Sequence, residues 1–277
     1  MTQPRNRRTN RGVALMGGGL VLGIGLAALV STCTGSDAAR SVAADASFAD
    51  QCDSVPDGAH RLTVTAGDGA RLGGAVGRAS SEQTGSPVVV LRHGASHTLC
   101  DWLDRSAAIS QETGADVVLL DRRSQGSSPG DADLSRDPSD ALSALDAATQ
   151  ADLVDPATAV VVMGSSMGNA SAFTLAAQLP RPACVVVGVS PVPVTGPLDG
   201  VATLASSGPR SPERVHLTWA TDDGKVPAHV ATLRRAADSA GVTVTTTEVD
   251  GDAHARAVLD QHEDAQRSVV EAISACS

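Results

Sequence analysis

The stretch that decides the fold is residues 159–169, which read A-V-V-V-M-G-S-S-M-G-N. Residues 160–163 are apolar and suit a strand buried on both faces, and a helix-compatible run, 169–179, follows the turn directly. The turn reads G-x-S-x-G, in which glycines two residues to either side of Ser166 let strand and helix backbones pass closely. A plain Ser/Gly loop would have similar letters, but it would lack the strand before and the helix after. We therefore predict Ser166, and not its neighbour Ser165, as a candidate nucleophile.

The rest of the chain repeats the order of apolar strand and helix. Alternating residues on both sides of the Gly-Asp-Gly turn at 67–69 predict a β-hairpin. The predicted strands are 60–66, 71–78, 87–91, 115–120, 160–163, 183–189, 214–220 and 242–249, and further helices are predicted at 102–113, 138–151, 227–240 and 255–275. Because the strands after the hairpin are mostly solid apolar runs, we expect a mostly parallel, eight-stranded α/β sheet with helices on both faces.

The first 33 residues indicate export. Residues 1–11 carry four arginines and no acid, and residues 12–30 are apolar throughout, as in a signal peptide. Val30-Ser31-Thr32-Cys33 resembles the bacterial lipobox, in which the cysteine is lipidated, although Thr32 stands where that motif has Gly, Ala or Ser. Three alternatives are therefore open: a lipoprotein anchored through Cys33, a secreted protein, and a protein anchored by an uncleaved 12–30 segment.

The domain organisation follows from length and local composition. A chain of 277 residues with 42% apolar content can bury one sizeable α/β core. The small and polar residues after the signal predict a disordered segment. We therefore expect a signal or lipoprotein anchor at 1–33, a flexible tether at 34–57 and a single domain at 58–277. We also expect an exported monomer, either at the cell surface or outside the cell.

The charge balance argues against nucleic acid as a partner. The chain has 21 Lys and Arg against 31 Asp and Glu, and removal of the four arginines of residues 1–11 leaves a net charge of −14. Such a surface repels DNA, RNA and anionic lipid headgroups. Aromatic side chains, which stack on bases, are limited to two Trp and two Phe.

Over residues 58–275 the chain resembles the α/β-hydrolase superfamily. The resemblance rests on G-x-S-x-G after a buried strand, followed by an acid and a histidine after later strands, in the family's order. It implies an α/β-hydrolase fold and an exported serine hydrolase of the esterase or lipase kind. The short connection between the strands at 183–189 and 214–220 leaves room only for a minimal cap, so we expect an open site that takes short-chain or soluble esters.

The resemblance also assigns the catalytic acid and base. Of seven histidines, His254 alone follows the final predicted strand, where the family has its catalytic histidine. The acid commonly stands three residues before the Val of a Val-Pro pair, which here selects Asp223. Asp222 is the alternative, and a helix-capping carboxylate is the non-catalytic interpretation of either. His254 would take the proton of Ser166, while Asp223 would fix the tautomer of the ring.

Two backbone N–H groups should form the oxyanion hole. The resemblance assigns one to Met167, after the nucleophile, and one to Ala95, after a His93-Gly94 pair that is similar to the family's His-Gly. We interpret His93 as a residue that shapes this loop. His93 and His97 stand four residues apart, but no Glu accompanies them as in a zinc-binding helix, so no metal is indicated.

The segment 121–128 resembles the family's Asp-x-Arg-Gly-x-Gly-x-Ser loop. Gly126 is retained, whereas Ser124 stands where glycine is usual. The match of this loop is therefore partial.

Together these residues predict cleavage of a small-molecule ester, with an amide or a thioester as the alternative, through an acyl-Ser166 intermediate. The resemblance implies neither a metal nor an organic cofactor. Two other functions are open: an acyltransferase that uses the same acyl-enzyme, and a non-catalytic, surface-anchored binding protein that keeps the fold.

Four cysteines beyond Cys33 predict two disulfides in an oxidising compartment. Cys184 precedes its strand and so lies at the edge of the sheet opposite the site, and Cys276 ends a last helix that runs to the same edge. Cys100 opens a helix on the catalytic side, which leaves Cys52 as its partner. We therefore predict Cys52–Cys100 and Cys184–Cys276.

Overall fold

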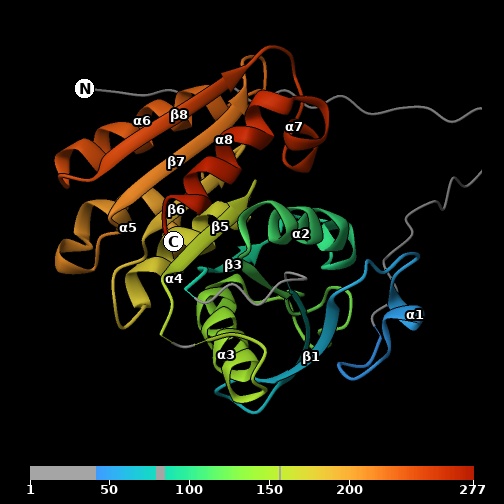
Figure 1. The fold of residues 1–277 in the computed structure, drawn as a ribbon. Coiled ribbons are helices and arrows are strands. Elements are labelled where there is room, and N and C mark those ends of the chain that lie inside the picture. The colour runs from blue at the N-terminus through green and yellow to red at the C-terminus, as the bar shows by residue number, and fades with distance from the viewer. Residues whose placement is uncertain (1–41, 79–84, 156) are drawn as a thin grey trace, which may run out of the picture. The chain divides into compact units, whose positions relative to one another are not determined.

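One twisted sheet of eight strands, covered by helices, organises the part of the chain that the structure describes (Figure 1). The computed structural model describes residues 42–78, 85–155 and 157–277, which belong to one unit. The predicted signal, Cys33 and the beginning of the predicted tether lie outside these residues. Among the described residues, no helix has the length and apolar character needed to cross a bilayer.

The strands agree with the predicted ones to within a few residues. They are β1 (Ala59–Thr65), β2 (Arg71–Gly77), β3 (Val88–Arg92), β4 (Asp116–Leu120), β5 (Val160–Ser165), β6 (Val185–Val189), β7 (Arg214–Ala220) and β8 (Thr243–Val249). The helices are α1 (Phe48–Gln51), α2 (Cys100–Thr113), α3 (Asp137–Gln150), α4 (Gly168–Gln178), α5 (Gly200–Ser206), α6 (Val226–Ser239), α7 (Arg256–Gln261) and α8 (Glu263–Ser274). Three short 3-10 turns occur among the described residues, at Leu134–Arg136, Gly196–Leu198 and Gly208–Arg210.

The strand order is β1-β2-β4-β3-β5-β6-β7-β8. β2 pairs antiparallel with β1 and β4, and all other neighbours are parallel. Every residue of β3 and β6 is buried, because valine-rich strands at the centre of a parallel sheet are covered on both faces. The predicted α/β-hydrolase fold is confirmed, including the initial hairpin.

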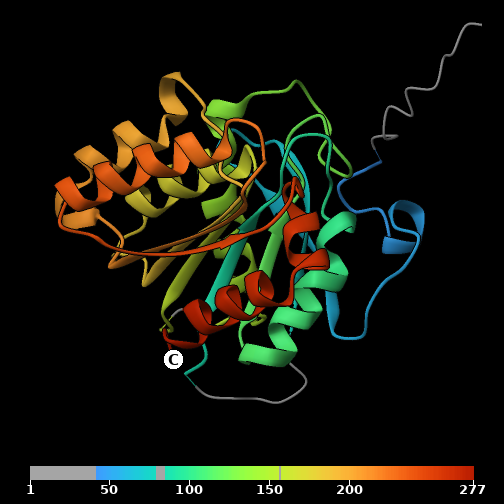
Figure 2. The same cartoon turned by 90° about the horizontal axis from the view of Figure 1, so that it is seen from above.

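Helices cover the sheet in two layers, which Figure 2 shows on opposite sides of the strands. α2, α7 and α8 pack on one face, where their side chains share an apolar cluster with β3, β5 and β6. α3, α4 and α6 pack on the other face. Because β3 and β5 to β8 run in the same direction, the loops at their carboxyl ends meet along one edge of the sheet.

The short cap is folded against the second of these layers. In the connection between β6 and β7, Leu204 of α5 is buried in the cluster that α4 and α6 form. A Cβ on Gly200 would lie 2.9 Å from the ring of Phe173 in α4, so α5 and α4 are in close contact. α5 was not predicted from the sequence.

The predicted last helix, 255–275, is wrong in one respect, because the structure divides it into α7 and α8. His262, expected within that helix, has φ −129° and ψ 105°, which is extended backbone. Glu263 and Asp264 follow in the first turn of α8, where acidic side chains favour a new helix start. These two acids were the local signal for the break.

The described part of the expected tether, residues 42–57, lies against the domain. Val42 donates its backbone N–H to the Gly126 carbonyl oxygen at 3.0 Å. Phe48 of α1 packs against the apolar cluster that α2 shares with the sheet. Further along the same segment, Cys52 forms a disulfide with Cys100. A continuous set of contacts therefore holds a segment that we expected to be flexible.

Both predicted disulfide pairings are confirmed. Cys52 and Cys100 have a Cα–Cα distance of 5.3 Å, and Cys184 and Cys276 one of 5.9 Å. The second pair joins the amino end of β6 to the residues after α8, at the edge opposite the loops that carry the predicted site.

Candidate active site

The candidate nucleophile stands on the sharp turn between β5 and α4. Ser166 directly follows β5 and has φ 52°, in the left-handed region that non-glycine residues rarely adopt. A Cβ on Gly164 would lie 2.6 Å from the Asn169 Cα, and a Cβ on Gly168 would lie 2.7 Å from the His93 carbonyl oxygen. Both glycines are required for this close approach of strand, helix and loop. The turn therefore presents Ser166 in a strained conformation, as expected of a nucleophile elbow.

Three of the predicted residues form one hydrogen-bonded chain. The Ser166 Oγ lies 2.8 Å from the His254 Nε2. The His254 Nδ1 lies 2.8 Å from the Asp223 Oδ1 and 2.9 Å from its Oδ2. Because an ionised carboxylate only accepts hydrogen bonds, the hydrogen of His254 is on Nδ1, and Nε2 accepts from the Ser166 hydroxyl. This is the tautomer that a general base beside a serine needs.

These side chains come from the carboxyl ends of parallel strands. Ser166 follows β5, Asp223 follows β7, and His254 follows β8, the neighbour of β7. A backbone hydrogen bond of 2.8 Å from the Asp222 N–H to the Gly251 carbonyl oxygen ties the last two loops together. The positions of acid and base are thus coupled through their backbones.

The structure distinguishes Asp223 from Asp222 and Ser166 from Ser165. Asp223 is 9% exposed and contacts His254, whereas Asp222 is exposed at the surface. Ser165 is fully buried, and its Oγ has no hydrogen-bond partner among the described residues. The Ser166 hydroxyl, in contrast, reaches His254. The geometry therefore favours Asp223 over Asp222 and Ser166 over Ser165.

The two predicted oxyanion donors flank Ser166. Met167 is the residue before α4, and Ala95 lies in the loop after β3. Within the ranges that the structure describes, neither backbone N–H donates a hydrogen bond to another group. A Cβ on Gly94 would lie only 3.2 Å from the Ser166 Cβ, so the Ala95 loop packs directly against the nucleophile. Two unpaired N–H groups beside Ser166 suit a negative charge that develops there.

The loop after β4 is organised by a buried carboxylate. Asp121 accepts hydrogen bonds from the Leu99 N–H at 2.6 Å, the Ser127 N–H at 2.7 Å and the Gln51 Nε2 at 2.6 Å. Burial raises the pKa of Asp121, and the hydrogen bonds from Ser127 and Leu99 oppose that rise. Ser124, where the family pattern has glycine, adopts φ 68°. Ser124 thus adopts the backbone conformation that glycine favours, although the loop matches the family pattern only in part.

A buried charged cluster that the sequence analysis did not anticipate lies behind the site. Arg92 at the end of β3 donates twice to the carboxylate of Asp137, the first residue of α3, and the Arg122 Nε lies 3.3 Å from the Asp137 Oδ1. All three side chains are at most 4% exposed. Burial by itself would raise the pKa of Asp137, but the two guanidiniums hold it well below its usual range. The available signal was an arginine within two residues of the end of each of two predicted apolar strands, because a buried charge requires a partner.

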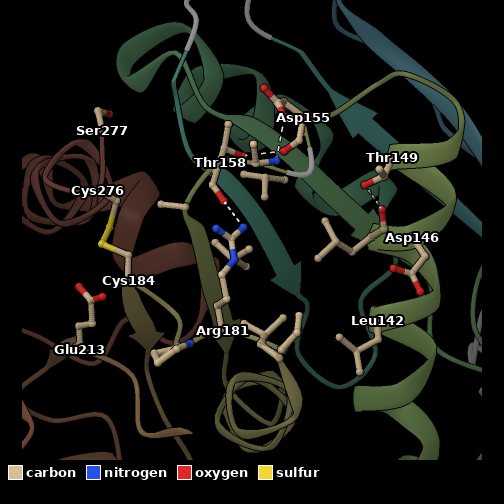
Figure 3. Close-up of a pocket in the computed structure, with 18 of the residues that line it drawn as sticks. Leu142, Asp146, Thr149, Asp155, Thr158, Arg181, Cys184, Glu213, Cys276 and Ser277 are labelled. Carbon is tan, nitrogen blue, oxygen red and sulfur yellow. Dashed lines mark hydrogen bonds between the residues drawn. A yellow bond between two sulfur atoms is a disulfide. The ribbon is translucent and has the colours of Figure 1, made fainter. Parts of the chain in front are cut away.

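A hollow of about 770 Å³ lies beside the Cys184–Cys276 disulfide (Figure 3). Apolar side chains from α3, β5 and the end of α4 line it, together with polar ones such as Asp146. The Arg181 Nη2 lies 3.4 Å from the Thr158 carbonyl oxygen within it. The described residues that line this hollow include neither the predicted triad nor the oxyanion donors. The hollow and the candidate active site are therefore separate.

Comparison with known proteins shows the family. A family model described as the Alpha/beta hydrolase family matches residues 88–271, which is more than half of the chain. No curated protein matches this chain in sequence. Solved structures with a similar fold include an esterase from Pyrobaculum calidifontis, with 16% identity and a TM-score of 0.62 over 83% of this chain and 89% of that one. A Pyrococcus furiosus esterase has 17% identity and a TM-score of 0.64 over 86% and 96% of the two chains.

A third solved structure, carboxyl esterase 2 from the mycorrhizal fungus Tuber melanosporum, has 16% identity and a TM-score of 0.62 over 81% of this chain and 89% of that one. At identities this low, the likeness establishes a shared fold. The family match, the strand order and the strand–turn–helix around Ser166 agree, and the chain belongs to the alpha/beta hydrolase family.

Proposed function

We propose that this protein is an exported serine hydrolase that cleaves a small-molecule carboxylic ester. The observation that carries the proposal is the chain of hydrogen bonds from Ser166 through His254 to Asp223, together with the two unpaired backbone N–H groups that flank Ser166. The names of the similar solved structures, which are esterases, support an ester as substrate.

The geometry suits a two-step reaction. In the first step the His254 Nε2 takes the proton of Ser166 as its Oγ attacks the ester carbonyl carbon, and the Ala95 and Met167 N–H groups stabilise the oxyanion. His254 then gives the proton to the leaving alcohol, and an acyl-Ser166 remains. In the second step His254 takes a proton from the water that attacks the acyl carbon. His254 then returns this proton to the Ser166 Oγ as the bond between Oγ and the acyl group breaks and the acid is released. Asp223 stabilises the imidazolium that forms in each step.

The exposure of the site supports a small or soluble ester. The His254 side chain is 42% exposed, although it is hydrogen-bonded on both ring nitrogens. The short cap between β6 and β7 packs against α4 and α6, as its buried Leu204 shows. A site that stays open to water suits short-chain esters better than long triglycerides.

Export is part of the same proposal. Two disulfides favour folding in an oxidising compartment, which agrees with the signal-like residues 1–33. Attachment to the membrane would come from a lipidated Cys33 or from the apolar 12–30 segment.

Labelling with a fluorophosphonate, followed by turnover of p-nitrophenyl esters of rising chain length, tests the proposed reaction. Ser166→Ala should abolish labelling and turnover with little change in the thermal midpoint, because Ser166 is a residue of the site and not of the apolar core. Ser165→Ala is the matched control and should stay active, since removal of a buried hydroxyl without a partner is close to neutral for stability. Equal behaviour of the two variants would show that the nucleophile is assigned wrongly.

The acid is tested in the same assay. Asp223→Asn should lower kcat by ~10³-fold or more, because the amide no longer stabilises the required tautomer and the imidazolium of His254. Asp222→Asn, one residue away and exposed, should leave kcat close to that of the wild type. The opposite result would transfer the role of the acid to Asp222.

A further inference from the structure

Two consecutive carbonyl groups precede the Ala95 N–H, and a side chain binds each of them. Arg122 donates from Nη2 to the His93 carbonyl oxygen. The His93 Nδ1 lies 2.9 Å from the Gly94 carbonyl oxygen. That second carbonyl belongs to the same planar peptide group as the Ala95 N–H, so the direction of one determines the direction of the other. The orientation of the predicted oxyanion donor is thus coupled to the His93 ring.

The contact between the His93 Nδ1 and the Gly94 carbonyl oxygen determines the tautomer of His93. A carbonyl oxygen only accepts hydrogen bonds, so the ring hydrogen must be on Nδ1. The side chain is fully buried, and Nε2 has no hydrogen-bond partner in the ranges that the structure describes. Burial lowers the pKa of His93 well below its usual value, and the charges of Arg122 and Arg92 lower it further. His93 is therefore a neutral ring that donates from Nδ1.

The His93 carbonyl group is also held in place, by Arg122. Arg122 is 4% exposed and its Nε lies 3.3 Å from the Asp137 Oδ1, so burial and this ion pair restrict its guanidinium. On the opposite side, the start of α4 packs so closely that a Cβ on Gly168 would lie 2.7 Å from the His93 carbonyl oxygen. The peptide between His93 and Gly94 is therefore enclosed between a buried arginine and the elbow.

We propose that the His93 Nδ1–H and the Arg122 guanidinium together orient the Gly94–Ala95 peptide and so aim the Ala95 N–H at the oxyanion. Both are positioning residues, because both side chains are buried and act through the backbone of the loop. The inference rests on the proposed function, since it concerns the oxyanion hole of that reaction. Arg122 stands at an x position of the family's Asp-x-Arg-Gly-x-Gly-x-Ser pattern, so the pattern itself assigns it no part in this arrangement.

The sharpest test is a pair of amide variants. His93→Asn places its side-chain NH₂ close to the position of Nδ1 and can still donate to the Gly94 carbonyl, whereas His93→Gln places its NH₂ near the position of Nε2. We expect His93→Asn to keep kcat within about threefold of the wild type. His93→Gln should lower kcat by about 10- to 100-fold, somewhat less than the loss of a whole oxyanion donor, with KM almost unchanged because the contact acts in the transition state.

Arg122→Met tests the second contact. The variant removes the donor to the His93 carbonyl but leaves Asp137 paired with Arg92, and kcat should fall by about tenfold at constant KM. His216→Gln is the matched control for the loss of a buried histidine, because His216 bonds Thr245 and Ser268 and has no contact with the site. Its kcat per folded molecule should equal that of the wild type.

The tautomer is measured independently of activity. In ¹⁵N spectra of protein with labelled histidines, the His93 signals, identified by their absence in His93→Asn, should show hydrogen on Nδ1 and no titration between about pH 5 and 8. An Nε2–H tautomer, a ring that titrates in this range, or equal kcat values for the Asn and Gln variants would overturn the inference. Absence of Ser166-dependent turnover in the wild type would instead contradict the proposed function, and the spectra would still decide the tautomer.

Discussion

Ser166 and Ser124 share an uncommon backbone conformation for different reasons. Both have positive φ, 52° and 68°, at positions on loops that follow strands. At Ser166 the conformation belongs to the turn that places the hydroxyl of the proposed nucleophile beside His254, so its strain belongs to the candidate site. Ser124 is exposed and stands where the family pattern has glycine, and no hydrogen bond of its side chain occurs among the described residues. Its strain therefore has no compensating contact.

Replacement of Ser124 by glycine should stabilise the protein. The left-handed conformation costs a non-glycine residue ~1–2 kcal/mol. Replacement by glycine removes this cost, but the greater entropy of glycine in the unfolded chain offsets part of the gain in stability. We expect Ser124→Gly to raise the free energy of unfolding by up to about 1 kcal/mol, measured by urea titration. Ser139→Gly is the control, because Ser139 is exposed but helical and should lose about 0.5–1 kcal/mol. A loss of stability in both variants would contradict the strain at Ser124.

At the scale of elements, one carboxylate joins β3, the loop after β4 and α3. Asp137 begins α3 and binds Arg92 of β3 and Arg122 of the loop after the neighbouring strand β4. Arg92 also donates from Nη1 to the Leu120 carbonyl oxygen at 2.9 Å, at the end of β4. The cluster therefore ties the ends of the strands beneath the oxyanion loop to the helix that covers them.

Loss of the Asp137 charge should destabilise the fold strongly. Asp137→Asn keeps the size of the side chain but leaves two buried guanidiniums without a counter-charge, and breaking a buried pair in this way costs about 3–5 kcal/mol. The matched control is Asp133→Asn, which affects an exposed pair with Arg136 and should cost at most about 1 kcal/mol. Urea unfolding of both variants measures the difference. Equal and small losses would mean that the buried cluster contributes little to stability.

At the scale of the whole molecule, the core joins the sheet to both helical layers, and His216 is a buried histidine between them. His216 of β7 is 4% exposed and is hydrogen-bonded to Thr245 of β8 at 2.9 Å and Ser268 of α8 at 3.1 Å. Burial lowers its pKa from the usual 6.5 to about 4. Protonation of this ring would place a charge between the last two strands and α8.

The stability of the protein should therefore fall in mild acid. The folded state disfavours protonated His216, so its contribution is fully present above pH 6.5 and is lost as the pH falls toward about 4. Between about pH 7.5 and pH 4.5 the wild type should lose roughly 2–3 kcal/mol more than His216→Gln, which cannot titrate at this position. Urea titrations of both proteins at the two pH values measure this. Parallel losses would show that other groups cause the acid sensitivity.

The sequence by itself determined the alternation of strands and helices, the elbow around Ser166 and the edge of the sheet that carries the site. These features depend on local patterns, because solid apolar runs require burial on both faces and G-x-S-x-G permits close backbone approach. The resemblance to the α/β-hydrolase superfamily then assigned Ser166, Asp223 and His254 to that edge. The disulfide pairing followed from the same reasoning about helix and strand ends.

Only the tertiary structure decided between residues that the sequence leaves equivalent. Asp222 and Asp223 are neighbours of identical type, and a hydrogen bond to a ring from another loop distinguishes them. The Asp137 cluster and the tautomer of His93 likewise depend on groups brought together from distant segments, as does the contact of residues 42–57 with the domain. The physical reason is that burial and hydrogen-bond partners are properties of the packed chain, whereas propensity and spacing can be read along it.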